Sequence, residues 1–251
     1  MPSGIIIIDK PAGWTSMDVC AKLRGIFREK RIGHAGTLDP MATGVLPVFV
    51  GRATRAVEFA SEGDKEYVAG LVLGIVTNTQ DTTGEVLRRQ LFSGTRRDLE
   101  AVLEQFRGDI LQLPPMYSAI KINGKKLYEL ARKGREVERQ LRPVTIHSLT
   151  LEDGSGQDEF VLRVRCSKGT YIRTLCHDIG QALGCGGAMS SLRRTMAAGF
   201  TLDDSVSLDQ VQQAGDPASL LLPVDAYFAQ RPILSLRPEG EKKVRNGMAL
   251  D

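Results

Sequence analysis

The segment Gly33–Gly44 presents a single carboxylate, Asp39, directly before Pro40. Glycines let a backbone approach a ligand closely, and a proline restricts the preceding residue to extended geometry. Such a segment can hold a carboxylate with little freedom. An aspartate is already ionised at neutral pH, so it needs no activating base to attack a sugar carbon or an activated ring carbon. Spacing alone also allows an aspartate in an ordinary turn.

A carboxylate nucleophile needs a cation to hold it, and Arg173 is the candidate. This arginine follows a basic strand and opens a predicted helix, and a guanidinium fits a carboxylate with two parallel bonds. Tyr67 and Tyr171 offer flat faces and hydroxyls for a base or a sugar. Taken singly, the arginine is equally compatible with the surface, and each tyrosine with packing.

Other chemistries find less support in the sequence. The four cysteines have neither a CxxC pair nor zinc spacing, and we expect buried free thiols. Cys176-His177-Asp178 looks like a nucleophile set, but neighbours on a helix point about 100° apart. Walker A, GxGxxG and GxSxG motifs are missing from the sequence. We therefore expect neither a metal site nor a cofactor.

Charge is segregated along the chain. The net charge is only +3, yet Lys22–Arg31, Lys121–Arg142 and Arg163–Arg173 carry +4, +5 and +4. Thr201–Gln230 holds five aspartates and no lysine or arginine. This pattern favours a face that binds a polyanion and an acidic back, although any single basic run could be a solvated surface.

These residues must be positioned by a mixture of strands and helices. Alternation and β-branched residues predict strands, and 3.6-residue periodicity with caps predicts helices. The stretch Gly33–Gly51, rich in Gly and Pro, is predicted to be a long irregular loop. The predicted strands are Gly4–Asp9, Tyr67–Leu73, Val86–Arg89 and Phe160–Cys166. Ser16 is predicted to cap a first helix, and further helices are predicted at Thr95–Phe106, which starts with a capping box between Thr95 and Asp98, at Leu127–Arg132 and at Ile172–Leu183.

Strands and helices interleave without regular βαβ alternation. The expected fold class is therefore α+β, with a mixed, largely antiparallel sheet. No apolar run approaches the ~18 residues of a membrane span. The first ten residues contain four isoleucines without a basic region before them, unlike a signal peptide. We expect a cytoplasmic protein that is not associated with a membrane.

Five motifs, in order along the chain, resemble those of the TruB family of tRNA pseudouridine synthases. The segment Asp9–Ser16 (DKPAGWTS) is similar to the family's opening motif, and Gly33–Gly44 is similar to its catalytic loop. The other three are Lys65-Glu66-Tyr67, Arg165–Arg173 (RCSKGTYIR) and Ser191–Arg194 (SLRR). Together they span most of the chain.

The resemblance implies roles for the residues that match. Asp39 would be the nucleophile, and Arg173 would pair with it. Tyr67 would stack on the target base and is a candidate proton acceptor. The family's pocket residues carry over to His34, Tyr171 and Leu192: the histidine contacts RNA at the flipped uridine, and the other two line the uridine pocket.

The resemblance also implies an architecture and a partner. The fold would be that of a pseudouridine synthase, a central, mainly antiparallel sheet with flanking helices and a catalytic cleft. Residues 1–230 would form the catalytic domain, with a basic RNA-clamping insertion at about 121–142, and residues 231–251 an incomplete PUA-like segment. The T-arm of tRNA would be the partner, its backbone contacted by Lys121, Lys125, Lys126, Arg132, Lys133 and Lys168.

The predicted reaction is isomerisation of the T-loop uridine at tRNA position 55 to pseudouridine, after the base has been flipped out of the loop. We expect no cofactor, no obligate protein partner and a monomer. Three alternatives stay open: a non-catalytic tRNA-binding or tRNA-folding protein on the same scaffold, an RNA-guided synthase that needs partner proteins, and a glycosyl hydrolase. The last usually needs a second carboxylate near the first.

Overall fold

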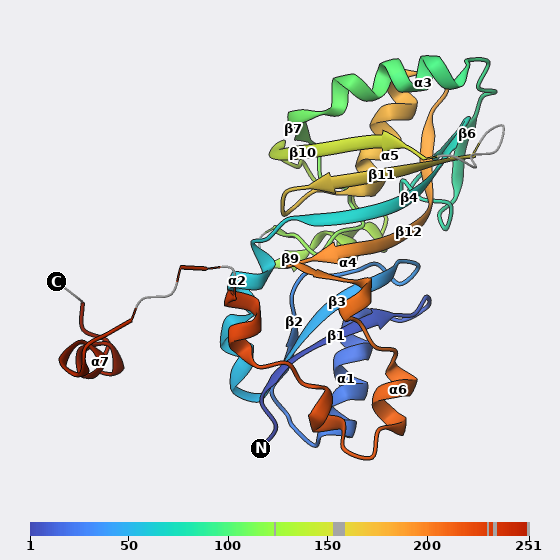
Figure 1. Cartoon of the computed structure of the whole chain (residues 1–251). Coiled ribbons are helices and arrows are strands. Elements are labelled where there is room, and N and C mark those ends of the chain that lie inside the picture. The colour runs from blue at the N-terminus through green and yellow to red at the C-terminus, as the bar shows by residue number, and fades with distance from the viewer. Residues whose placement is uncertain (123, 153–158, 230, 233–234, 250–251) are drawn as a thin grey trace.

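The computed structural model describes residues 1–122, 124–152, 159–229, 231–232 and 235–249. Two lobes share one continuous sheet, with strand order β1-β3-β12-β4-β11-β10-β7 (Figure 1). Among the described strands of this sheet, β12 and β3 form a parallel pair and all other pairs are antiparallel. The expected α+β class with a mainly antiparallel mixed sheet is confirmed.

The first lobe is built from the N-terminal part of the chain and a later helix, α6. The four consecutive isoleucines Ile5–Ile8 lie in β1, and all four side chains are buried. The elements of this lobe are β1 (Gly4–Lys10), α1 (Ser16–Phe27), β2 (Ile32–His34), β3 (Thr43–Val50), α2 (Val57–Ser61) and α6 (Leu208–Gln213).

The second lobe holds the longer strands, with α3 and α5 packed on one face of its sheet. Leu99 and Leu103 of α3 and Leu175 and Ile179 of α5 share a core with the strands. The elements are β4 (Lys65–Leu73), β5 (Ile75–Thr77), β6 (Val86–Arg89), α3 (Arg96–Leu103), β7 (Gly108–Gln112), β10 (Arg142–Leu151), β11 (Glu159–Cys166), α5 (Ile172–Ala182) and β12 (Gly187–Ala197). The short β13 (Phe200–Thr201) pairs with the end of β12 and packs its phenylalanine in the core of the first lobe.

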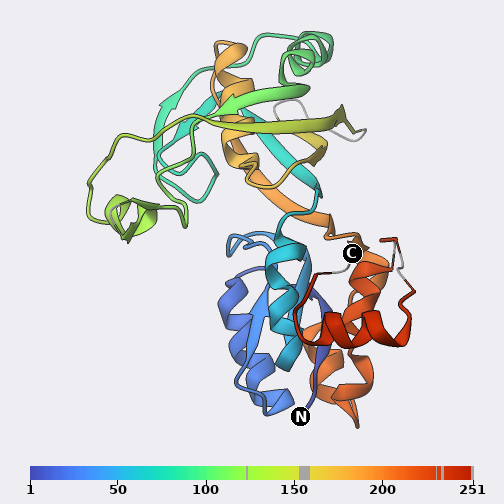
Figure 2. The same ribbon diagram turned by 90° about the vertical axis from the view of Figure 1, so that its left-hand side faces the viewer.

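Between β7 and β10 the chain leaves the sheet as an arm. It contains β8 (Lys121–Ile122), β9 (Lys125–Lys126) and α4 (Leu127–Ala131). Figure 2 shows this yellow-green arm projecting away from the second lobe. The helix expected at Leu127–Arg132 is thus present, one residue shorter.

Near the C-terminus, α7 (Pro238–Arg245) lies apart from both lobes (Figure 1). The PUA-like segment expected at residues 231–251 falls partly on residues 233–234 and 250–251, which lie outside the described residues. Nowhere in the described ranges is a helix both long and apolar enough to cross a membrane.

The prediction of a long irregular loop at Gly33–Gly51 is wrong, because β2 and β3 occupy most of it. Val45, Leu46, Val48 and Phe49 are completely buried in β3. Pro47 is tolerated since it lies just beyond the last β2–β3 pair, where its carbonyl accepts a bond from the Ala35 N–H at 2.9 Å. The irregular part shrinks to residues 35–42, around Asp39.

The start of α1 also differs from the prediction. Thr15, not Ser16, is the N-cap, and it forms a capping box with Asp18. The Ser16 hydroxyl instead accepts a hydrogen bond from the Leu38 N–H at 2.9 Å. The expected capping box of α3, between Thr95 and Asp98, is confirmed.

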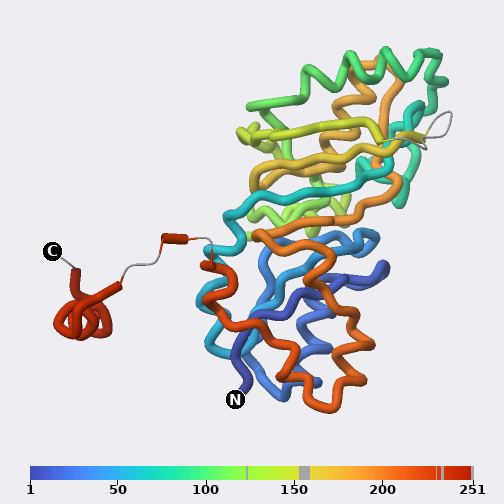
Figure 3. The backbone as a smooth tube through the Cα atoms, viewed as in Figure 1, coloured from blue at the N-terminus to red at the C-terminus, as the bar shows by residue number. Residues whose placement is uncertain are grey.

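The junction between the lobes is narrow. Only Arg193↔Thr43 and Arg194↔Gly44 pair in register between β12 and β3, and the two tubes run side by side there in Figure 3. Gly44 has φ +100°, and a Cβ added to it would lie 2.2 Å from the carbonyl oxygen of Arg194. The close approach of the two backbones therefore requires glycine.

We expect Gly44→Ala to lower the free energy of unfolding by about 3 kcal/mol or more, because its methyl group would collide with backbone rather than with a flexible side chain. Gly199→Ala is the matched control, since Gly199 has φ +83° with nothing within 4 Å of the added Cβ. It should cost about 1–2 kcal/mol of left-handed strain. Urea unfolding measures both, and equal losses would contradict a steric role for the junction.

Candidate active site

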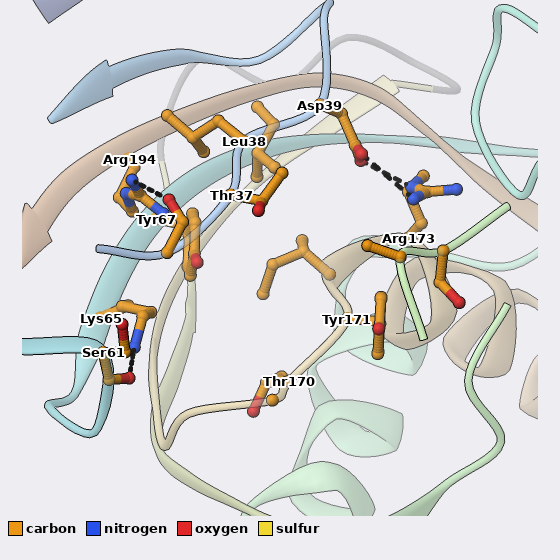
Figure 4. A pocket seen from close by; sticks show the side chains of 16 residues that line it. Thr37, Leu38, Asp39, Ser61, Lys65, Tyr67, Thr170, Tyr171, Arg173 and Arg194 are labelled. Atoms are coloured by element: carbon orange, nitrogen blue, oxygen red, sulfur yellow. Dashed lines mark hydrogen bonds and ion pairs between the residues drawn. The ribbon is translucent and has the colours of Figure 1, made fainter. Parts of the chain in front are cut away.

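A pocket of about 280 Å³ lies where the lobes meet. One wall comes from the loop after β2, and the others come from the start of β4, the arm, the turn before α5, and β12. Figure 4 shows Asp39 and Arg173 facing each other on one side, with Tyr67 and Arg194 on the other. Asp39, Tyr67, Tyr171, Arg173 and Leu192, all predicted from sequence, line this one pocket.

The carboxylate of Asp39 is held by Arg173 through two atoms. The Arg173 Nε lies 2.8 Å from one carboxylate oxygen and Nη2 lies 3.3 Å from the other. The Arg173 side chain is 6% exposed, whereas that of Asp39 is 36% exposed. The guanidinium is thus fixed in the protein while the carboxylate reaches into the pocket.

Arg173 is itself anchored at several points. It donates hydrogen bonds to the carbonyl oxygens of Tyr117, at 2.8 Å, and Thr79, at 3.2 Å. A second carboxylate, Asp81, lies 3.8 Å from its Nε. Sequence reasoning missed Asp81, because it stands in a polar connection whose approach to α5 depends on the tertiary fold.

Asp81 is buried and its position is well defined. One carboxylate oxygen accepts bonds from the hydroxyls of Thr79 and Thr83, at 2.7 and 2.5 Å, and from the Thr83 N–H at 3.0 Å. The other oxygen faces Arg173. The arginine therefore lies between a structural carboxylate and the carboxylate exposed to the pocket.

The loop that carries Asp39 is tied to the opening motif of the chain. Lys10, which is fully buried, donates to the carbonyl oxygens of Pro11, Trp14 and, at 3.4 Å, Pro40. The Gly13 N–H donates to the Pro40 carbonyl at 2.8 Å. Burial lowers the pKa of Lys10 to about 8. These bonds explain how residues so far before Asp39 fix its position.

Tyr67 and Leu192 form an apolar wall of the pocket, on β4 and β12. They are 6% and 8% exposed and belong to the core of the second lobe. Burial raises the pKa of the Tyr67 phenol, and the Arg194 guanidinium acts in the opposite direction. A flat base could lie against this wall.

Tyr171 precedes α5 and is held by its backbone. Its N–H donates to the side-chain oxygen of Gln112 at 2.9 Å, and its carbonyl accepts from the Gln112 amide at 3.2 Å. Burial raises the pKa of its phenol. The side chain is consequently free to face the pocket.

His34 lies at the end of β2, outside the pocket lining. Its Nδ1 is buried, with no hydrogen-bond partner in the described parts of the chain. Burial lowers the pKa of this histidine, and Arg194 acts in the same direction. The structure thus places His34 directly before the loop that carries Asp39 and outside the pocket lining.

The residues predicted to contact the RNA backbone also lie outside the pocket lining. Lys168 is in the turn before α5 and forms an ion pair with Glu62. The other five are on the arm: Lys121, Lys125, Lys126, Arg132 and Lys133. Of these, the Lys126 ammonium and the Arg132 guanidinium each lie 5.4 Å from the centre of the Tyr128 ring.

Two buried cations of the pocket wall, Lys65 and Arg194, stand in the sequence only as parts of motifs, with no role predicted for either. Both side chains donate hydrogen bonds to backbone carbonyls, which for Lys65 are those of Ser61 and Gly63. Lys65 stands just before the predicted strand Tyr67–Leu73, and Arg194 stands in β12, which the sequence analysis does not predict. The sequence therefore gives no signal for the burial of these two side chains or for their partners.

The cysteines are buried, as expected, and all four are free thiols. Burial raises the pKa of Cys176 to about 12, so this thiol is not a ready nucleophile. The trio Cys176-His177-Asp178 therefore has no catalytic arrangement, in agreement with the prediction. Within the described ranges no group of three or more His, Cys, Asp or Glu could hold a metal ion.

Comparisons with known proteins identify the family of this chain. Residues 24–172 match the sequence model of the TruB family pseudouridylate synthase N-terminal domain, and residues 173–229 match the tRNA pseudouridylate synthase B C-terminal domain. The chain is similar to tRNA pseudouridine synthase B from Bacillus cytotoxicus, with 46% identity over 98% of this chain and 84% of the relative. The protein of the same name from Azoarcus sp. is 47% identical over 98% and 83%.

A solved structure shares the fold. The match to a Cbf5-Nop10-Gar1 complex has a TM-score of 0.69 and 31% identity, covering 89% of this chain and 61% of that one. The mainly antiparallel sheet, the carboxylate in its cleft and the matching sequence models define a pseudouridylate synthase. More particularly, the chain belongs to the TruB family.

The two-point contact between Arg173 and Asp39 generates the first prediction for this site. Arg173→Lys keeps the charge but loses the fork and the bonds to Tyr117 and Thr79, so kcat for pseudouridine formation should fall about 100-fold or more. The KM for RNA should stay within a few-fold. Arg163→Lys, a change on β11 outside the pocket lining, is the control and should retain most activity. A near-normal kcat in Arg173→Lys would show that a single positive charge is sufficient to position Asp39, and would contradict the need for the two-point contact.

Asp178 allows a test of burial on the back of α5. Burial raises its pKa from 3.8 to about 6, so the folded state binds the proton more tightly and loses stability as pH rises through this range. Asp178→Asn should therefore raise the free energy of unfolding at pH 7 by about 1–3 kcal/mol. The gain should vanish near pH 3.5. Denaturant unfolding at both pH values checks this, and a gain that is equal at both would contradict it.

Proposed function

We propose that this chain is a tRNA pseudouridine synthase that isomerises the T-loop uridine at position 55. The relatives at 46–47% identity carry the name tRNA pseudouridine synthase B. The observation that carries the proposal is the partly exposed Asp39 carboxylate, fixed by buried Arg173 at the edge of a pocket with an apolar wall. This arrangement suits a nucleophile acting on one nucleotide.

The reaction breaks the N1–C1′ bond, rotates the base and forms a C5–C1′ bond. A proton leaves C5 and another reaches N1, so the base is isomerised without oxidation or reduction. Asp39 would attack C1′ or C6, or assist elimination to a glycal; the three routes share the same carboxylate. Arg173 holds that carboxylate at two points and keeps it aimed at the ring.

The target base must leave the folded loop before it can reach Asp39. Extrusion costs a few kcal/mol, which contacts in the pocket must offset. Tyr67 and Leu192 would receive one face of the base and Tyr171 the other side. His34, directly before the loop that carries Asp39, would contact the RNA at the flipped nucleotide once the loop has adjusted to it.

The T-arm would lie along the cleft, with its phosphates near the arm at residues 121–142. Lys121, Lys125 and Lys133 are exposed there, as phosphate contacts require. In this proposal residues 1–230 are the catalytic domain and residues 231–251 an incomplete PUA-like segment. The enzyme would act in the cytoplasm, as a monomer, without a cofactor and without an obligate protein partner.

Two alternatives have weaker support. A tRNA-binding protein without activity would not need a carboxylate fixed by an arginine, and the similar curated relatives are named as synthases. The solved Cbf5-Nop10-Gar1 structure is a complex of several proteins, but the identity to it is 31%, against 46–47% to the curated relatives. A synthase acting directly on tRNA is the better match.

Tritium release from C5-labelled uridine in a tRNA transcript tests the proposal. Wild type should release tritium, and Asp39→Asn should lose at least about 10⁴-fold of the rate while it still binds tRNA. Asp203→Asn, at an exposed aspartate outside the pocket lining, is the control and should be fully active. Turnover by Asp39→Asn would refute the nucleophile assignment. Binding without release by wild type would favour the non-catalytic alternative.

A further inference from the structure

Arg194 is completely buried at the junction of the lobes, and its charge is only partly satisfied. Its Nε donates to the Val45 carbonyl at 2.7 Å and its Nη2 to the Gly36 carbonyl at 3.0 Å. Nη1 is buried and finds no backbone or carboxylate acceptor in the described residues. None of the ion pairs found there joins this guanidinium to a carboxylate.

A second buried cation reinforces the local positive field. A Cβ added to Gly36 would lie 3.2 Å from the Arg194 Nη1 and 3.3 Å from the Lys65 Cε, so both side chains pack against this glycine. Burying a cation without a counterion is energetically unfavourable. The two buried cations become more favourable when a neighbouring group loses a proton and carries a negative charge.

Tyr67 is the neighbouring group that can become negative. It lines the pocket beside Arg194, and a hydrogen bond links its phenol to the guanidinium (Figure 4). The ionisable groups that act on it are Arg194 from β12, Cys166 from β11 and Asp39 from the catalytic loop. Burial, Cys166 and Asp39 oppose ionisation of the phenol, and Arg194 favours it. Arg194 thus supplies the compensation that a phenolate in this position requires.

We propose that Arg194 is a positioning residue that acts through Tyr67: it fixes the phenol at the pocket wall and stabilises its phenolate, which takes the proton from C5 of the base. The identity of the substrate proton rests on the proposed function; the pairing of Arg194 with Tyr67 does not. The guanidinium itself need not touch the substrate.

The proton step is balanced. The phenol first loses its proton to water. After the C5–C1′ bond has formed, the C5–H bond breaks, its electron pair returns to the ring, and the proton moves to the phenolate oxygen. N1 takes a proton from water, which balances the one that the phenol first released, so the base remains an isomer of uracil. Tyr67 ends the turnover as a phenol again, and Arg194 stays charged throughout.

The first test needs no substrate. The chain has five tyrosines, so ¹³Cζ-tyrosine labelling gives few resonances, and Tyr67→Phe identifies that of Tyr67. We expect Tyr67 to titrate at clearly higher pH in Arg194→Gln than in wild type, and close to wild type in Arg194→Lys, which keeps the charge. Circular dichroism defines the pH range in which each variant is folded. If Arg194→Gln does not fold, the comparison is made between wild type and Arg194→Lys.

Three results would overturn the inference. In the first, the pKa of Tyr67 is the same in wild type and Arg194→Gln. In the second, Tyr67 of wild type stays protonated up to the pH at which the protein unfolds. In the third, Arg194→Lys raises the pKa of Tyr67 as much as Arg194→Gln does. Each would show that the charge of Arg194 does not govern this phenol. Because the readout is spectroscopic, these results stand whether or not the chain acts on tRNA.

A kinetic test links the pair to turnover. In single-turnover tritium release, Arg194→Gln should lower the rate at pH 7 by at least about tenfold and regain part of it as pH rises. In a Tyr67→Phe background the same substitution should leave the pH profile unchanged. A loss that is equal at every pH, or that persists fully in the Tyr67→Phe background, would indicate a purely structural role. Wild type without tritium release would instead refute the proposed function.

Discussion

The ion pair between Asp39 and Arg173 joins the two lobes at the point where chemistry must occur. Asp39 belongs to the loop between β2 and β3 of the first lobe, and Arg173 to α5 of the second. The backbone ladder between the lobes consists of two residue pairs. The position of the carboxylate in the cleft therefore depends on how each partner is held within its own lobe.

Each lobe devotes a separate network to this purpose. In the first, Lys10, Gly13 and Ser16 bind the backbone of Pro40 and Leu38 on either side of Asp39. In the second, carbonyl oxygens of the arm and of the β5–β6 connection hold Arg173, with Asp81 behind it. Preorganised groups of this kind stabilise developing charge without rearranging during the reaction.

Charge is distributed unevenly around the pocket. One side carries a carboxylate paired with an arginine, and the other carries two buried cations that face backbone carbonyls and a phenol. A uracil base placed between them would meet the Asp39 carboxylate on one side and a positive field on the other. Desolvation strengthens both effects, because water screens neither fully in a partly enclosed cleft.

Local signals in the sequence predicted local structure well. The Thr95–Asp98 capping box and the alternation along Phe160–Cys166 appear as expected, since both depend on neighbouring residues. The sequence does not predict strand β3, because the Gly and Pro residues of the segment Gly33–Gly51 are typical of a loop and conceal the buried apolar run. The strand β12 was missed because its polar residues, Arg194 among them, hide a buried strand.

The site was predictable to the extent that motifs carry it. Of five predicted pocket residues, Asp39, Tyr67, Tyr171 and Arg173 are candidates by their own chemistry, and Leu192 follows from the resemblance alone. Asp81 and the partners of Lys65 and Arg194 are not predicted. These depend on segments far apart in sequence, such as the approach of the β5–β6 connection to α5. No pattern of spacing within either segment encodes that contact.

The most direct measurement is a crystal structure of the Asp39→Asn variant bound to a T-arm stem-loop RNA. We predict that the target uridine is flipped into the pocket with its base against Tyr67 and Leu192. Its C1′ and C6 should be in van der Waals contact with residue 39, with Arg173 still anchored to the carbonyls of Tyr117 and Thr79. A uridine that remains stacked in the loop, or a base in the pocket with its reacting carbons away from residue 39, would contradict the assignment of Asp39 as nucleophile.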